Sequence, residues 1–436
     1  MVNTNLNIDI HHVTRVEGHG NITVNVKDGK IEKCQWSVVE APRFFEAMVV
    51  GQKWDVLHHI TSRICGICSI GHTLTSLKAT ESAFGIKISP MSSKLRRLAV
   101  HAENLQSHTL HVGYLILPDL MGVGSVIPLA SSHPAEVNIV VGLHKVANQM
   151  SGLVCGRTTH PQRLIPGGFT KYPTKDELKA LRDKLDGSWG DITTVAKLVL
   201  SLAGKLPNFT RETEFIALTS KDEFALYDGL IGSTDTESAP VERYLEYTNE
   251  YLVPESTAKY AKHARKSYMV GALARINKNY DRLSPKAKEV AAMFNLKPVC
   301  HNPYMNSVAQ LVEIVHSTED SIRIIDEILA DNSYNIKNTC VEFKPKAGRG
   351  FGGVEVPRGI LFHDYTYNER GFCEKANCII PTNQNHANIQ HDMEALVPQI
   401  LDKPKPEIEL TLEMLVRAYD PCISCSTHML NVKFKE

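Results

Sequence analysis

The sequence lacks an excess of charge of either sign. Among its 436 residues, Lys+Arg and Asp+Glu number 48 each, so the formal net charge is zero. Without a basic excess, neither nucleic acid nor an anionic membrane is expected as the main partner. A near-neutral surface opposes association only weakly, which favours a tightly bound partner subunit.

The sequence also lacks a signal peptide and a long uninterrupted apolar run. Its first residues, MVNTNLNIDIHH, contain neither a basic n-region nor an apolar h-region. The most apolar stretch, HVGYLILPDLMGVGSVIPLA, is interrupted by Pro118, Asp119 and Pro128, which indicates buried core rather than a transmembrane segment. We therefore expect a cytoplasmic protein whose ten cysteines are reduced. Such thiols serve as metal ligands, catalytic groups or small buried hydrophobes, not as a disulfide framework.

The N-terminal region has the pattern of a β-hairpin. Apolar and polar residues alternate over 22–26 and again over 34–38, and Asp28-Gly29 between them is a strong hairpin turn signal.

Helical periodicity dominates the middle of the chain. Apolar residues form one stripe over 92–117, which predicts a long core helix, and Thr174 with Glu177 predicts a capping box at the start of an amphipathic helix. Further helices are predicted over 192–205, 256–276, 285–294, 308–331 and 411–418. After Lys346 the pattern changes to a glycine-rich loop followed by strand, turn and strand.

These patterns predict a mainly α chain of the α+β class, with a large helical-bundle body and small β elements from both ends. We expect a single domain with three parts: an N-terminal β region (1–60), a helical body (61–345), and a C-terminal part with β elements and a metal-binding segment (346–436).

Two CxxC motifs lie near opposite ends of the chain. RICGICSIGH contains Cys65 and Cys68, DPCISCSTHML contains Cys422 and Cys425, and each motif is followed by a histidine. Each CxxC turn directs two sulfur atoms toward one point, so the pair supplies four soft ligands suited to zinc, iron–sulfur, copper(I) or nickel. A structural zinc site usually takes both halves from one short segment. From spacing alone, structural zinc and a catalytic metal remain equally open.

The local sequences around these cysteines resemble the two signatures of nickel–iron hydrogenase large subunits. The resemblance extends over essentially the whole chain, because further motifs follow in the family's order. These are RVEGHG (15–20), RFFE (43–46), GRTTHP…PGG (156–168), VPRG (356–359) and CIIPTNQN (378–385). The resemblance implies the large-subunit fold and reversible heterolytic cleavage of H2 at a buried nickel–iron site.

The resemblance assigns all four thiolates to nickel. Cys65 and Cys422 would bind nickel alone, whereas Cys68 and Cys425 would bridge to an iron that carries carbon monoxide and cyanide. Thiolates fit this chemistry because they supply electron density and a sulfur that can be protonated.

Glu17 matches the family glutamate that receives a proton from the terminal thiolate, here Cys422. Without the resemblance, a structural carboxylate paired with Arg15 or Arg43 would be the preferred interpretation.

Four further residues match groups around the metal pair. Arg358 corresponds to the arginine over its open face, which holds a cyanide and acts as base or stabilising cation. Pro381 and Thr382 correspond to the positions that contact the other cyanide. His72 corresponds to the histidine that hydrogen-bonds the bridging sulfur of Cys68.

A second metal is also implied by the resemblance. Glu46, His428 and the backbone carbonyl near Cys378 match the protein ligands of a hard cation, usually Mg²⁺ and otherwise another divalent ion, with waters completing the shell.

The partner that the resemblance implies is an iron–sulfur small subunit. PTNQN stands where membrane-bound members commonly have PTTWN or PSTWN, so the chain looks more like the soluble branch. That branch couples H2 to NAD(P) with flavin, a deazaflavin, ferredoxin or a heterodisulfide reductase. The chain has no Gly-rich dinucleotide fingerprint and no cysteine set for a cluster of its own, so its electrons must leave through partner subunits.

Three alternatives remain beside the catalytic subunit. A hydrogen-sensing regulatory homologue would keep all four cysteines, and a structural zinc protein would use them differently. The quinone-site subunits of respiratory complex I share the fold but have lost the cysteines, which argues against that relationship. In much of the family a protease cuts after the final histidine. Here it would cut His428–Met429 and release MLNVKFKE, although we expect this tail to be retained.

Overall fold

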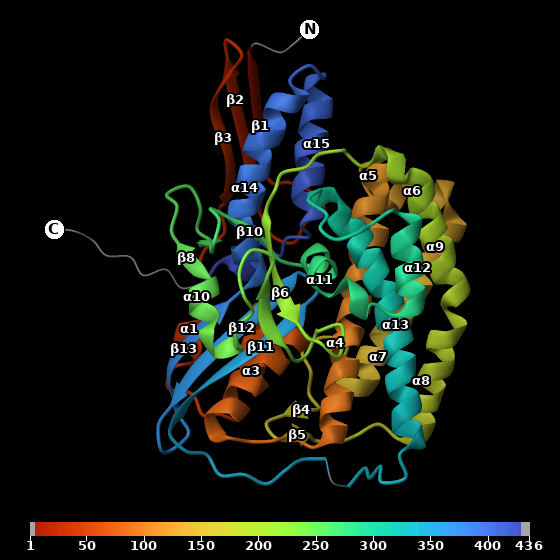
Figure 1. The fold of residues 1–436 in the computed structure, drawn as a ribbon, viewed down its shortest axis with the longest axis vertical. Helices are drawn as coiled ribbons and strands as arrows, with labels where there is room; N and C mark the ends of the chain where they lie inside the picture. The colour runs from red at the N-terminus through yellow and green to blue at the C-terminus, as the bar shows by residue number, and fades with distance from the viewer. Residues whose placement is uncertain (1–4, 338, 429–436) are drawn as a thin grey trace, which may run out of the picture.

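A helical bundle makes up one side of the molecule. The computed structural model describes residues 5–337 and 339–428, and the bundle lies on the right in Figure 1. Its helices are α4 (Pro90–Leu110), α5 (Leu117–Met121), α6 (Val126–Ser132), α7 (Pro134–Cys155), α8 (Lys175–Gly187), α9 (Trp189–Leu202), α12 (Pro285–Met293) and α13 (Asn306–Ala330). The predicted capping box is present at α8, where Thr174 Oγ1 and the Glu177 carboxylate accept each other's backbone N–H at 3.2 and 2.7 Å.

The predicted core helix over 92–117 is confirmed with one change of winding. α4 continues into a π-helix at His111–Ile116 before α5 begins. Within the described residues, no single helix is long and apolar enough to cross a membrane. One helix pair, Pro90–Met121 with Val126–Ser132, meets that test together across a 75° bend.

The N-terminal hairpin is confirmed within an antiparallel sheet of order β1-β2-β3. Its strands are β1 (Leu6–Ile10), β2 (Gly20–Lys27) and β3 (Lys30–Val38). Asp28 and Gly29 both have positive φ, 48° and 74°, as a two-residue hairpin turn with the right-handed strand twist requires.

The C-terminal sheet consists of β11 (Gly348–Val356), β12 (Gly359–Tyr367) and β13 (Cys373–Ile379), with α3 (Ser69–Phe84) packed on it. The glycine-rich segment predicted as a loop is part of β11, so that prediction is wrong. Gly348, Gly350 and Gly352 alternate along the strand and share one face. A Cβ there would lie 2.7 Å from the carbonyl oxygen of Ala83, 2.2 Å from that of Ala79 and 2.1 Å from that of Thr75. The glycines therefore let α3 rest directly on the strand backbone.

The middle of the chain is less helical than expected, and the predicted helix over 256–276 is wrong. Only α11 (Ala272–Asn279) forms there, because Tyr268–Met269 pairs with β6 and Gly271 has a φ of 119°. The minor elements of the middle region are β4 (Leu164–Ile165), β5 (Gly168–Phe169), β6 (Glu214–Thr219), β7 (Leu230–Ser233), α10 (Tyr244–Tyr247), β8 (Asn249–Tyr251), β9 (Tyr260–Lys262) and β10 (Tyr268–Met269).

Four helices bring the two ends of the chain together. They are α1 (Phe45–Val49), α2 (Leu57–Thr61), α14 (Pro381–Ile400) and α15 (Lys405–Ala418). The Gln390 side chain on α14 accepts from the backbone N–H of Trp36 and donates to the backbone carbonyl of Cys34, both at 2.7 Å. This side chain completes the edge of β3 as a neighbouring strand would, and it fixes α14 beside the N-terminal sheet.

We expect Gly350→Ala to lower the free energy of unfolding by about 1–3 kcal/mol, because the new methyl group would overpack against α3. Denaturant unfolding measures the change. Gly142→Ala on α7 is the matched control, since a Cβ there would meet nothing within 4 Å, and Ala has the higher helix propensity. Equal stabilities of the two variants would contradict the proposed packing.

Candidate metal centre

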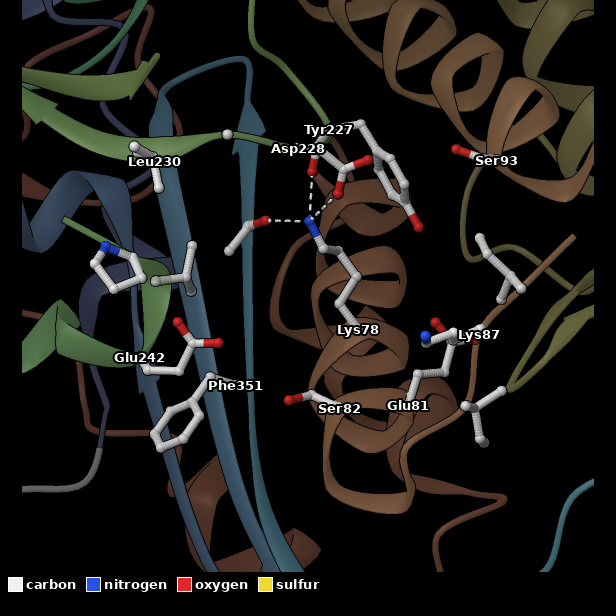
Figure 2. Close-up of a pocket in the computed structure, with 16 residues that line it drawn as sticks. Lys78, Glu81, Ser82, Lys87, Ser93, Tyr227, Asp228, Leu230, Glu242 and Phe351 are labelled. Atoms are coloured by element: carbon white, nitrogen blue, oxygen red, sulfur yellow. Dashed lines mark hydrogen bonds and ion pairs between the residues drawn. The ribbon is translucent and has the colours of Figure 1, made fainter. Parts of the chain in front are cut away.

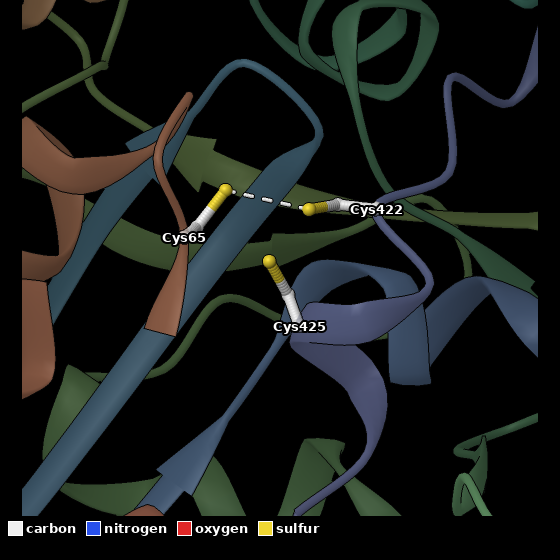
Figure 3. A group of neighbouring side chains, drawn as sticks. All are labelled: Cys65, Cys422 and Cys425. Atoms are coloured by element: carbon white, nitrogen blue, oxygen red, sulfur yellow. Dashed lines mark hydrogen bonds between the residues drawn. The ribbon is translucent and has the colours of Figure 1, made fainter. Parts of the chain in front are cut away.

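Three cysteine sulfurs from opposite ends of the chain meet in the core. Ligand atoms of Cys65, Cys422 and Cys425 all lie within 4.8 Å of one another, and the Cys65 and Cys422 sulfurs are 3.3 Å apart (Figure 3). Cys68 falls outside this group, although its backbone N–H donates to the Cys65 sulfur at 3.2 Å. All four are buried and belong to one apolar cluster.

The four thiols differ in their affinity for protons. Hydrogen bonds from Cys422, Cys425 and Cys68 hold the pKa of the Cys65 thiol well below its usual range. Burial raises the pKa of the Cys422 and Cys425 thiols. Metal ligation requires thiolates, so binding must displace these protons. A dry cluster of thiolates is a donor set that soft transition metals prefer, and the residues therefore fit a nickel–iron centre.

Arg358 follows β11 in the turn to β12 and reaches the same cluster. Its Nη1 donates to the Cys68 sulfur at 3.4 Å, its Nε to the Asp420 carbonyl at 2.6 Å, and its Nη2 to Asp420 Oδ1 at 2.8 Å. The guanidinium is 3% exposed, so its charge acts on the sulfurs with little screening by water. Asp420 had no predicted role, although it is the first residue of the C-terminal motif DPCISCSTHML.

Glu17 lies against Cys422. The Cys422 thiol donates to Glu17 Oε2 at 3.2 Å, and the Ser424 N–H donates to the same oxygen at 3.1 Å. The Ser424 hydroxyl donates to the other carboxylate oxygen, and an isolated parallel bridge joins the Glu17 and Cys422 backbones. The alternative pairings do not form: Arg15 pairs with Asp119, and Arg43 donates to the Ile64 carbonyl.

Pro381 and Thr382 begin α14 beside the cluster, and Thr382 Oγ1 accepts from the Cys422 N–H at 3.1 Å. The His72 ring lies one turn into α3 with its Nδ1 3.3 Å from His363 Nε2. The expected bond from His72 to the Cys68 sulfur stays a prediction.

Glu46 on α1 meets His428 at the end of the described chain. Nδ1 of His428 lies 2.8 Å from Glu46 Oε1, while Glu46 Oε2 and His428 Nε2 are buried without a hydrogen-bond partner. Burial raises the pKa of Glu46, but the adjacent His428 outweighs it and holds that pKa below its usual range. Two unsatisfied ligand atoms and a retained negative charge fit a hard cation here. The bond His428–Met429 and the tail beyond it lie outside the described residues.

Glu103 is a site residue that sequence reasoning missed. From α4 its carboxylate accepts the Ile70 N–H at 2.7 Å and the Gly71 N–H at 3.0 Å, which caps the first turn of α3 just after Cys68. α3 has no side-chain cap of its own. No local sequence signal marks Glu103, because its partners lie more than 30 residues away.

An open cleft of about 500 Å³ near the other end of α3 is separate from this centre (Figure 2). Lys78 points into it, but its ammonium group already donates to Asp228 and to the carbonyls of Tyr227 and Gly353. The lysine therefore offers no unused donor to a ligand.

Comparison with known proteins gives consistent matches over the whole chain. A model described as nickel-dependent hydrogenase matches residues 43–138 and 217–428, and one described as HoxL-like matches residues 7–41. The alpha subunit of sulfhydrogenase 1 of Pyrococcus furiosus is 32% identical, with 99% of this chain and all of that protein covered. One subunit of the F420-non-reducing hydrogenase vhc of Methanococcus voltae is also 32% identical, over 97% of this chain and 95% of that protein.

Solved structures agree with these matches. An NAD⁺-reducing [NiFe]-hydrogenase in its H2-reduced state superposes with a TM-score of 0.88 and 26% identity, covering 98% of this chain and all of that one. The Ni-Fe-Se hydrogenase of Desulfomicrobium baculatum, at 21% identity, shares the fold with a TM-score of 0.78, covering 97% of this chain and all of that one. The expected large-subunit fold is confirmed.

We expect Glu103→Gln to change the pH dependence of stability in protein prepared without metal. Burial raises the pKa of Glu103 from 4.5 to about 8, so the folded chain binds more protons than the unfolded chain between those pH values. The free energy of unfolding therefore falls as pH rises through this window, and Glu103→Gln should reduce that fall. Denaturant unfolding at several pH values measures it, with Glu289→Gln on the exposed face of α12 as control. An unchanged profile in Glu103→Gln would contradict the assignment.

Proposed function

The chain belongs to the nickel-dependent hydrogenase family. On that premise we propose which of its residues hold the metals, which accepts the proton and which orient the sulfurs. It is the catalytic subunit of a hydrogenase, an oxidoreductase that cleaves H2 reversibly into protons and electrons. The meeting of the CxxC thiols in a dry core is the observation that carries the assignment.

We propose Cys65 and Cys422 as terminal nickel ligands and Cys68 and Cys425 as bridges to iron. A nickel–iron pair held by these thiolates supplies the soft, electron-rich metals that split H2 heterolytically. Carbon monoxide and cyanide are proposed as the iron's other ligands, with Arg358 holding one cyanide and Pro381 and Thr382 the other.

Glu17 is proposed to take the proton from the Cys422 sulfur. Its Oε2 already accepts from that thiol at 3.2 Å, which is within reach for direct transfer. The Ser424 N–H and hydroxyl keep the carboxylate pointed at the sulfur. Because Glu17 is only partly buried, it can pass the proton outward.

Arg358 and His72 are proposed to act on the Cys68 sulfur. The buried guanidinium stabilises negative charge at Cys68 and serves as the cation over the open face; despite this burial, Asp420 and the cysteine sulfurs hold its pKa well above the usual range. His72 is proposed to orient the Cys68 sulfur from the first turn of α3.

Glu46, His428 and the Cys378 backbone carbonyl are proposed to hold Mg²⁺ or another divalent ion. The unsatisfied atoms of Glu46 and His428 support this role, and the cation would tie the C-terminal segment to α1.

An iron–sulfur small subunit is proposed to receive the electrons beside Cys65. The relatives are named as subunits of hydrogenases, which implies a multi-subunit enzyme. Gly66, in the turn between the two N-terminal cysteines, is exposed, as are Arg63 and Arg157. An acidic partner that carries the clusters is proposed to dock on this exposed basic surface beside Cys65.

Further electron-transfer subunits, linked to NAD(P) and flavin, deazaflavin, ferredoxin or heterodisulfide reductase, are proposed beyond it. The whole chain is proposed to act as one domain. A cytoplasmic location is proposed because all ten cysteines lie in described residues and are free thiols.

We expect Glu17→Gln to lower the rate of hydrogen/deuterium exchange by about a hundredfold or more, while nickel and iron remain near equal stoichiometry. The amide keeps the shape of the carboxylate but cannot take the proton. Exchange by mass spectrometry and elemental analysis measure the two effects. Glu40→Gln, near the exposed His19, is the matched control. Normal exchange in Glu17→Gln would refute the proton role, and zinc alone in the parent protein would refute the metal assignment.

We expect Arg63→Glu to weaken retention of the small subunit during copurification, because it places a negative charge on the docking surface. Lys179→Glu, on the exposed face of α8, makes the same change of sign elsewhere. Equal retention by both variants would locate the docking surface away from Cys65.

A further inference from the structure

His111, the first residue of the π-helix, lies one layer behind Arg358. Its side chain is 1% exposed, and both ring nitrogens have partners. Nδ1 faces Oε1 of Gln310 on α13, and Nε2 lies 2.8 Å from the backbone carbonyl oxygen of Arg417 on α15. Both partner atoms are carbonyl oxygens, which only accept hydrogen bonds.

The orientation of Gln310 is fixed by its second contact. Its amide nitrogen donates to Asp420 Oδ2 at 2.9 Å, and the other Asp420 oxygen is held by Arg358 at 2.8 Å. A flipped amide would bring two acceptor oxygens together against a carboxylate that is already paired with a guanidinium. Gln310 therefore presents its oxygen to His111, and both nitrogens of the His111 ring must carry protons.

We propose that His111 is a buried imidazolium that acts as a positioning residue. Through Gln310 it holds Asp420, and Asp420 in turn orients Arg358 toward the Cys68 sulfur. The charged groups facing the ring support this state, because Asp420 Oδ1 lies 3.8 Å from Nε2, and the Arg417 guanidinium is paired with two carboxylates, those of Asp119 and Glu413. His111 therefore adds a second cation behind the sulfur cluster, where thiolate charge collects.

Histidine NMR tests the protonation state directly and does not depend on the proposed role of Arg358. In the assembled enzyme labelled with ¹⁵N-histidine, the resonance lost in His111→Gln identifies this ring, and its perturbation in Gln310→Glu provides a second identification. Because each ring nitrogen faces a carbonyl oxygen, we expect both nitrogens of this ring to be protonated in that spectrum. A neutral tautomer would overturn the proposal.

The positioning role is tested by turnover of the metal-loaded enzyme, and this part rests on the proposed function. We expect His111→Gln to lower kcat by about tenfold to a hundredfold, the effect of a small misplacement at a reacting centre, with nickel content retained. His111→Lys should recover part of the loss because it restores a cation. His144→Gln, on α7, is the matched control. Unchanged turnover in His111→Gln, or equal losses in its Gln and Lys variants, would overturn the proposal.

Discussion

The contact between Cys65 and Cys422 is the constraint on which the rest of the structure depends. Their sulfurs lie 3.3 Å apart although 357 positions separate them in the sequence. Closing so long a loop costs conformational entropy, and no disulfide offsets it. Backbone contacts do so instead: Glu17 bridges to Cys422, and the Arg43 N–H donates to the Thr427 carbonyl at 2.9 Å. Two short segments from the N-terminal region thus hold the C-terminal turn in place.

Buried ion pairs join the helices that surround the sulfur cluster. Arg275 pairs with Glu313 and Glu355, and Arg417 pairs with Asp119, all almost fully buried. Breaking such a pair is costly because it leaves an unpaired buried charge. These pairs therefore lock α11, α13 and α15 around the centre, and Arg358 is left as the cation that faces the sulfurs.

The sequence correctly predicted the elements that are determined by residues close together in the chain. The Asp28-Gly29 turn and the Thr174–Glu177 capping box formed as expected, because each depends on residues within three positions of one another. α14 was not predicted, since its buried first turns carry Asn383, Gln384 and Asn385, and polar residues hide the apolar period. The glycines of β11 were mistaken for a loop because the reason for them, the backbone of α3, lies more than 260 residues earlier. Glu103 and Gln310 were not identified from the sequence for the same reason, since their partners are distant along the chain. Family resemblance did point to Glu17, Arg358 and Glu46, whose roles remain predictions.

The contact between His428 and Glu46 has a consequence for how the protein is made. Because Cys422 follows Cys65 by 357 positions, the centre stays incomplete while the ribosome adds the intervening chain. At typical elongation rates this takes roughly 20–70 s. Throughout that time Cys65 and Cys68 have no partner sulfurs, and α3 can fold on β11 only once residue 348 has emerged. A nascent chain of this protein therefore passes through a long interval with an unpaired thiol pair, which favours metal delivery after the second CxxC motif has been synthesised.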